Sequence, residues 1–117
     1  MKSNKWEVCE FSARLANAYQ NVTYGKPDVF DVVETHESLL AALASAANND
    51  GDTTVRGNGA DFRNREIGWA LADATEAKRQ RPDLDDEQLA KLAQAATGLP
   101  DEIFYAPAAV RVRHLLK

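Results

Sequence analysis

Apolar side chains return every three or four positions in four segments of the 117-residue chain, which is the spacing of an amphipathic helix. One glycine-rich stretch, residues 49–60, lacks this periodicity and is expected to be a flexible loop. The fold class that follows is all-α, a compact bundle in a single domain. The predicted helices cover residues 5–22, 28–48, 62–81 and 86–97, with a short C-terminal helix over residues 107–116.

The best defined of these helices has both a start signal and a stop signal. Asp85 and Gln88 have the spacing of a capping box, in which the two side chains accept backbone N–H groups at the helix start. Gly98 is expected to take the left-handed conformation that often ends a helix, and Pro100 cannot continue it. A helix of about three turns is marginal alone in water, so its apolar stripe must be buried against the rest of the protein.

Three stretches leave a strand open as the alternative. Residues 6–11 could form a short strand, although apolar and polar positions alternate poorly there. Residues 29–33 are rich in β-branched side chains, which lowers their helix propensity, and Thr35 could begin a separate helix. Residues 53–56 also resemble a short strand but have no obvious partner, so they are assigned to the loop, while the helical interpretation is preferred for the other two stretches.

Composition places the chain among ordinary globular proteins, with 44% hydrophobic and 27% charged residues. The longest apolar-biased run, residues 39–47, is too short to cross a bilayer, so no membrane contact is expected. The N-terminal residues lack the apolar segment of a signal peptide. Cys9 is the single cysteine and cannot form an internal disulfide, which agrees with a reducing compartment. We therefore expect a cytoplasmic protein.

Residues able to carry catalysis or hold a metal are sparse. His36 and His114 are the two histidines, and neither has a second imidazole or a thiolate at ligand spacing. The acidic loop that starts at Asp50 has Val55 where a calcium loop needs its glycine. The serines also lack the context of an activated nucleophile. No metal, no cofactor and no enzymatic activity are predicted.

The charges and aromatic side chains favour contact with another protein. A net charge of −4 argues against general binding to nucleic acid, which requires neutralisation of phosphates. On the predicted second helix, acids spaced by three form a stripe suited to a basic partner: Asp28, Asp31, Glu34 and Glu37. Trp69 could anchor such an interface, as could Trp6, Phe104 or Tyr105. The predicted function is a small regulatory or adaptor protein, and a homodimer is left open.

The alternative is a DNA-binding regulator. Within residues 85–117, a helix followed by a tight turn and further helix looks like the scaffold half of a helix-turn-helix. Pro107 interrupts the segment where a straight recognition helix would run. The alternative gains support if its candidate phosphate ligands gather on one exposed face: Arg63, Arg65, Arg111, Arg113 and Lys117.

Overall fold

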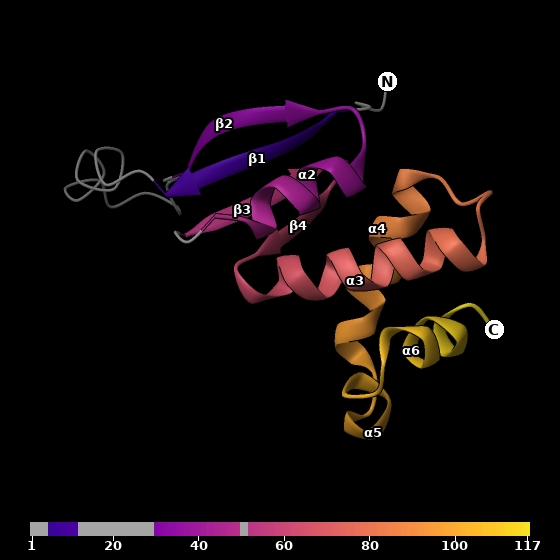
Figure 1. The fold of residues 1–117 in the computed structure, drawn as a ribbon. Helices are drawn as coiled ribbons and strands as arrows, with labels where there is room; N and C mark the ends of the chain where they lie inside the picture. The colour runs from indigo at the N-terminus through magenta and orange to yellow at the C-terminus, as the bar shows by residue number, and fades with distance from the viewer. Residues whose placement is uncertain (1–4, 12–29, 50–51) are drawn as a thin grey trace.

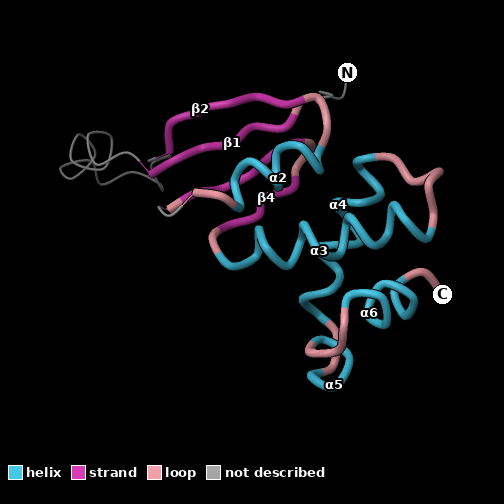
Figure 2. Tube along the Cα trace, in the orientation of Figure 1, coloured by secondary structure: helices cyan, strands magenta, loops and turns pink. Residues whose placement is uncertain are grey.

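The computed structural model describes residues 5–11, 30–49 and 52–117 and shows a mixed α/β fold (Figure 1). The all-α bundle expected from the sequence is therefore wrong. The described residues form a four-stranded antiparallel sheet in the order β2-β1-β3-β4, with helices beside it (Figure 2). The strands are β1 (Trp6–Phe11), β2 (Phe30–His36), β3 (Thr53–Gly57) and β4 (Ala60–Arg63). The helices are α2 (Leu39–Ala47), α3 (Arg65–Gln80), α4 (Asp86–Ala95), η1 (Ala96–Gly98), α5 (Asp101–Phe104) and α6 (Ala108–Leu115).

The two predicted N-terminal helices are the main error. Residues 6–11 form β1 and residues 30–36 form β2, while residues 12–29 lie outside the described part of the chain. Among the described residues of the predicted second helix, only Leu39–Ala47 is helical, as α2. Ser38 begins this helix, because its hydroxyl accepts the backbone N–H of Ala41 at 2.9 Å. Thr35 does not begin a separate helix, since it lies within β2.

The alternation in β1 and β2 is irregular for two physical reasons. Val8 and Cys9 are adjacent and both fully buried, although neighbouring residues of a strand point to opposite faces of a sheet. Such a strand does not alternate between apolar and polar residues. A β-bulge adds to this, because the pairing of β1 with β2 passes from Val8 opposite Glu34 to Cys9 opposite Val32, which leaves Val33 as the extra residue.

Residues 53–60, expected to lie in a loop, instead belong to a tight β-hairpin. Gly57 pairs with Ala60, and only Asn58 and Gly59 lie between them. Both have positive φ angles, 50° and 84°, as a type I′ turn requires. Because the type I′ twist matches that of the flanking strands, the Asn-Gly pair fixes how β3 and β4 meet.

The hairpin turn can be tested by comparing two glycine substitutions that should change the free energy of unfolding in opposite directions. Gly59→Ala should reduce the free energy of unfolding by about 1 kcal/mol, because a side chain disfavours its positive φ. Gly68→Ala should increase it by about 0.5–1 kcal/mol, because Gly68 lies within α3 and a new Cβ would meet open space. Thermal unfolding of both variants checks this pair, and a stabilised Gly59→Ala protein would contradict the turn.

The C-terminal half is mostly helical, as the apolar periodicity predicts, but some helices begin or end at other residues than predicted. The helix predicted over residues 62–81 begins at Arg65 because the preceding residues form β4. The capping box of Asp85 and Gln88 is confirmed, since each side chain accepts the other residue's backbone N–H. The left-handed conformation expected at Gly98 is wrong, because α4 ends through the 3-10 turn η1 and the only described glycine with positive φ is Gly59.

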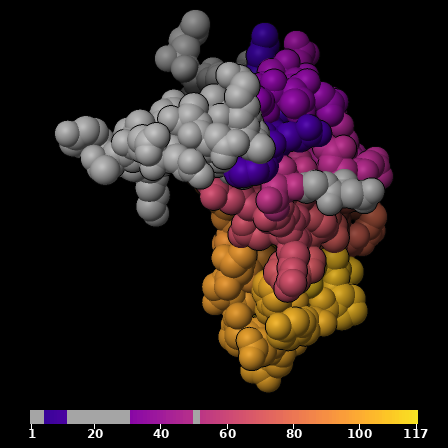
Figure 3. Space-filling model, turned by 90° about the vertical axis from the view of Figure 1, so that its left-hand side faces the viewer, coloured from indigo at the N-terminus to yellow at the C-terminus, as the bar shows by residue number. Residues whose placement is uncertain are grey.

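Helix α3 is the centre of the fold. Helix α2 lies against β1, β2 and β3, while α3 contacts α2, α4 and α6 (Figure 1). The backbone N–H of Leu39 donates to Asp86 Oδ2 at 3.0 Å and joins the start of α2 to the first turn of α4. The β-strands gather at one end of the molecule and α4 to α6 at the other (Figure 3). The side chains that fill the core between these layers include Trp6, Val8, Val55, Phe62, Leu39, Leu43, Ile67, Leu89 and Val112.

Candidate functional site

A pocket of about 370 Å³ opens where α3 meets the C-terminal helices, and we call it the aromatic pocket. Its lining comes from the end of β4, the first half of α3, the end of α4 with η1, the end of α5 and one side chain of α6. Six elements between residues 60 and 115 therefore converge on it. A concave site of this size is typical of small-ligand or side-chain recognition.

Three aromatic rings form one wall of the pocket. The Trp69 and Phe104 ring centroids are 5.0 Å apart with the planes at 88°, and Phe104 meets Tyr105 at 5.0 Å and 90°. Such edge-to-face pairs contribute about 0.5–1.5 kcal/mol each beyond area burial. Trp69 is nevertheless 47% exposed and Tyr105 is 77% exposed. Two large rings are thus held in place at the surface.

A buried ion pair that also lines the pocket holds the backbone of this wall in place. Arg111 Nη2 lies 2.6 Å from Asp73 Oδ1, and Arg111 Nε donates to the same oxygen at 2.8 Å. The guanidinium also donates through Nη1 to the carbonyl oxygens of Phe104 at 2.9 Å and Ala106 at 2.7 Å. Because these carbonyls flank Tyr105, one arginine fixes the backbone that carries two of the three rings.

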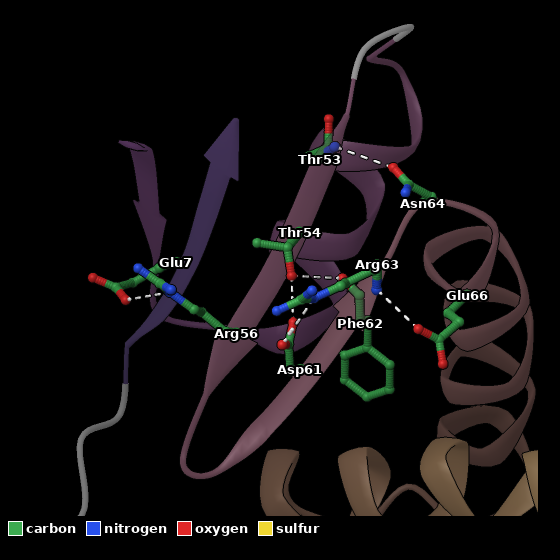
Figure 4. A network of polar contacts seen from close by, with 9 residues as sticks. All are labelled: Glu7, Thr53, Thr54, Arg56, Asp61, Phe62, Arg63, Asn64 and Glu66. Atoms are coloured by element: carbon green, nitrogen blue, oxygen red, sulfur yellow. Dashed lines mark hydrogen bonds and ion pairs between the residues drawn. The ribbon is translucent and has the colours of Figure 1, made fainter. Parts of the chain in front are cut away.

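Two acids, Asp61 of β4 and Glu66 of α3, also line the pocket, and Figure 4 shows their polar contacts. Asp61 Oδ2 accepts from Arg63 Nε at 3.1 Å, and Asp61 Oδ1 accepts from the hydroxyl of Thr54. Glu66 lies in the first turn of α3, and its Oε1 accepts the backbone N–H of Arg63 at 3.2 Å. Asn64 lies between β4 and α3, and its Oδ1 accepts the backbone N–H of Thr53 of β3 at 3.3 Å. The end of β4 and the start of α3 are therefore fixed relative to each other.

The predicted acidic stripe does not form one helical face. Asp28 lies outside the described residues, Asp31 and Glu34 are on β2, and Glu37 follows that strand. A spacing of three gathers side chains on one face of a helix but not of a strand, whose period is two. Glu34 faces α2 instead, where its carboxylate accepts the hydroxyl of Ser45 at 2.9 Å and 3.0 Å. Of the aromatic anchors considered from the sequence, Trp69, Phe104 and Tyr105 line the pocket, whereas Trp6 is buried in the core.

The predicted phosphate ligands are also separated by the fold. Arg111 is buried and paired with Asp73, so its guanidinium does not face a phosphate backbone. Arg63 pairs with Asp61 beside β4. Exposed Arg65 begins α3, whereas exposed Arg113 and Lys117 lie on and just after α6.

The helical segment that would read DNA is short. After η1 comes α5, which has four residues, and Pro107 then precedes α6. A recognition helix must be long enough to lie along the major groove. The geometry therefore gives the DNA-binding alternative little support.

Sequence reasoning missed the ion pair between Asp73 and Arg111. A signal was present, because Asp73 falls on the α3 face that also carries Ala70, Ala74 and Ala77, all of them buried. A carboxylate on the apolar face of a helix requires a partner, since burial of an unpaired charge is very costly. Phe104 and Tyr105 were considered as anchors from the sequence, but the contact of Phe104 with Trp69 could not be predicted.

No family model, curated protein or solved structure matches this chain. Within residues 5–11, 30–49 and 52–117, no three His, Cys, Asp or Glu side chains come together as a metal site. None of the described helices is both long and apolar enough to cross a membrane. The proposal of a function therefore rests on the geometry of the aromatic pocket.

Proposed function

We propose that the protein is a non-enzymatic interaction module that binds a segment of another protein at the aromatic pocket. The observation that carries this proposal is the exposure of Trp69 and Tyr105 at the mouth of a concave site. Aromatic side chains that fill or border such sites supply much of the binding energy at protein interfaces. Exposed rings of this size gain free energy when a partner covers them.

The wall is also organised before any partner arrives. Phe104 contacts both exposed rings at right angles, and Arg111 binds the carbonyls on either side of Tyr105. A surface that is already ordered loses less conformational entropy on association, so more of the contact energy appears as affinity. This arrangement supports a binding role for the rings in addition to any packing role.

The proposal can be tested by comparing what immobilised variants capture from host lysate. Trp69→Ala and Tyr105→Ala should each lose a protein that the wild type retains, identified by mass spectrometry. The affinity for that purified protein should fall by about 30-fold with Trp69→Ala, because a hot-spot truncation costs about 2 kcal/mol or more.

Val33→Ala provides the matched control. Val33 is 46% exposed, nearly as much as Trp69, but it lies on β2 away from the pocket lining. Its variant should bind the same partner with unchanged affinity. Equal binding by the wild type, Trp69→Ala and Tyr105→Ala would exclude the aromatic pocket as the binding surface.

A further inference from the structure

Among the acids that line the aromatic pocket, Glu66 differs in its surroundings. Asp73 is neutralised by Arg111, and Asp61 lies against Arg63. The Glu66 carboxylate accepts a backbone N–H of Arg63 and has no cationic side chain within ion-pair distance among the described residues. Its negative charge is therefore available to a ligand in the pocket.

Two further features make the interior of the pocket attractive to a cation. Aromatic rings present negative faces, so the wall of Trp69, Phe104 and Tyr105 favours a positive group lying over it. Ala96 and Thr97 of η1 also line the pocket, at the C-terminal end of α4. The end of a helix carries partial negative charge on its last carbonyl groups.

We propose that the aromatic pocket receives an arginine side chain from a basic segment of the partner protein, an inference that rests on the proposed function. A guanidinium is planar, so it stacks on an aromatic ring while its edge donates two hydrogen bonds to a carboxylate. Glu66 supplies the carboxylate, and Trp69 or Tyr105 supplies the ring. The net charge of −4 would also attract a basic segment during encounter.

Arginine fits these surroundings better than lysine does. An ammonium group is compact and strongly hydrated. A guanidinium is more weakly hydrated, so it loses less hydration free energy when it enters a pocket with an aromatic wall. The volume of about 370 Å³ is near the lower end for ligand pockets, which suits one side chain.

The chain contains its own reporter for this interaction. It has two tryptophans, of which Trp69 lines the pocket and Trp6 is buried in the core. In an NMR titration of the nitrogen-15-labelled protein, the indole N–H signal of Trp69 should move with ligand and that of Trp6 should not. Trp69→Phe assigns the two signals. The probes are short Gly-Ser peptides with one central residue, which is arginine, citrulline, lysine or glutamate.

As the arginine peptide is added, the chemical shift of the Trp69 indole N–H should change and then reach a plateau. Citrulline has the shape of arginine without its charge, and its peptide should bind about tenfold more weakly, as should the glutamate peptide. The lysine peptide should also bind more weakly than the arginine peptide, because its ammonium group is more strongly hydrated. Glu66→Gln should lower the affinity for the arginine peptide by a similar factor, because glutamine still accepts the backbone N–H of Arg63 but carries no charge. Glu37→Gln removes an exposed charge outside the pocket lining and should leave the affinity unchanged.

Three results would overturn the arginine assignment: citrulline binding as well as arginine, an unchanged affinity in Glu66→Gln, or no movement of the Trp69 signal with the arginine peptide. None of them would alter the capture experiment, in which loss of a partner from Trp69→Ala supports the binding function itself. If Trp69→Ala retains every partner, the binding function fails, whatever the peptides do. The two proposals can therefore fail separately.

Discussion

Arg111→Met is expected to reduce the free energy of unfolding by about 3–5 kcal/mol, because it leaves a buried carboxylate without its partner. The Asp73 side chain is only 2% exposed and its Oδ1 receives two donors from Arg111. The same substitution removes the donor to the carbonyls of Phe104 and Ala106. Urea unfolding at neutral pH, followed by circular dichroism, measures the loss.

The matched control is Arg113→Met on the same helix, where the side chain is exposed. This surface change should alter the free energy of unfolding by no more than about 0.5 kcal/mol. A double variant, Asp73→Leu with Arg111→Met, should recover most of the loss, because apolar residues of similar size can replace a buried ion pair at little cost. Equal effects of the two single arginine substitutions would show that the pair contributes nothing to stability.

The C-terminal half was predictable because its signals are local. A capping box needs only Asp85 and Gln88, three residues apart, and both side chains have the expected bonds. The apolar stripe of α3 also repeats within single turns of one helix. Where a structure is specified by residues less than two turns apart, the sequence shows it directly.

The sheet was not predicted because its pairing is not local. β1 pairs with β2 and with β3, whose residues are distant in sequence, and both faces of β1 carry buried side chains. The β3–β4 hairpin did have a local signal, since Asn58 and Gly59 are an Asn-Gly pair between two short runs that form strands. The Asn-Gly pair therefore indicates that the short run at residues 53–56 pairs with residues 61–63, which follow the turn.

The candidate site was predicted only in part, for the same reason. Exposed aromatic anchors can be suggested from composition, and Trp69 does line the pocket. Its neighbours Phe104 and Tyr105 reach it only because α6 and α3 pack together, with Arg111 lying 38 residues from Asp73 in sequence. The acids of residues 28–37 were assigned to one face because a helix was expected there. Residues 30–36 form the strand β2 instead, in which a spacing of three does not gather side chains on one face.

Trp6→Ala is expected to reduce the free energy of unfolding by about 3–5 kcal/mol, because it would leave a large cavity in the core. Trp6 is 1% exposed and lies on β1 between the two neighbouring strands. Its indole packs closely on β3, since a Cβ added at Gly57 would come within 2.7 Å of Trp6 Cε3. Removal of this ring would weaken both the strand pairing and the layer of helices above it.

Trp69→Ala is the matched comparison, with the same atoms removed from a half-exposed site. This substitution removes one edge-to-face contact with Phe104 and the partly buried surface of the indole. The free energy of unfolding should therefore fall by about 1–2 kcal/mol. Urea unfolding of both variants, followed by circular dichroism, gives the two values on one scale. If Trp69→Ala cost as much as Trp6→Ala, the ring at the pocket would be a core element. If Trp6→Ala cost as little as Trp69→Ala, β1 would not be the buried strand described above, because its largest side chain would then contribute little to the core.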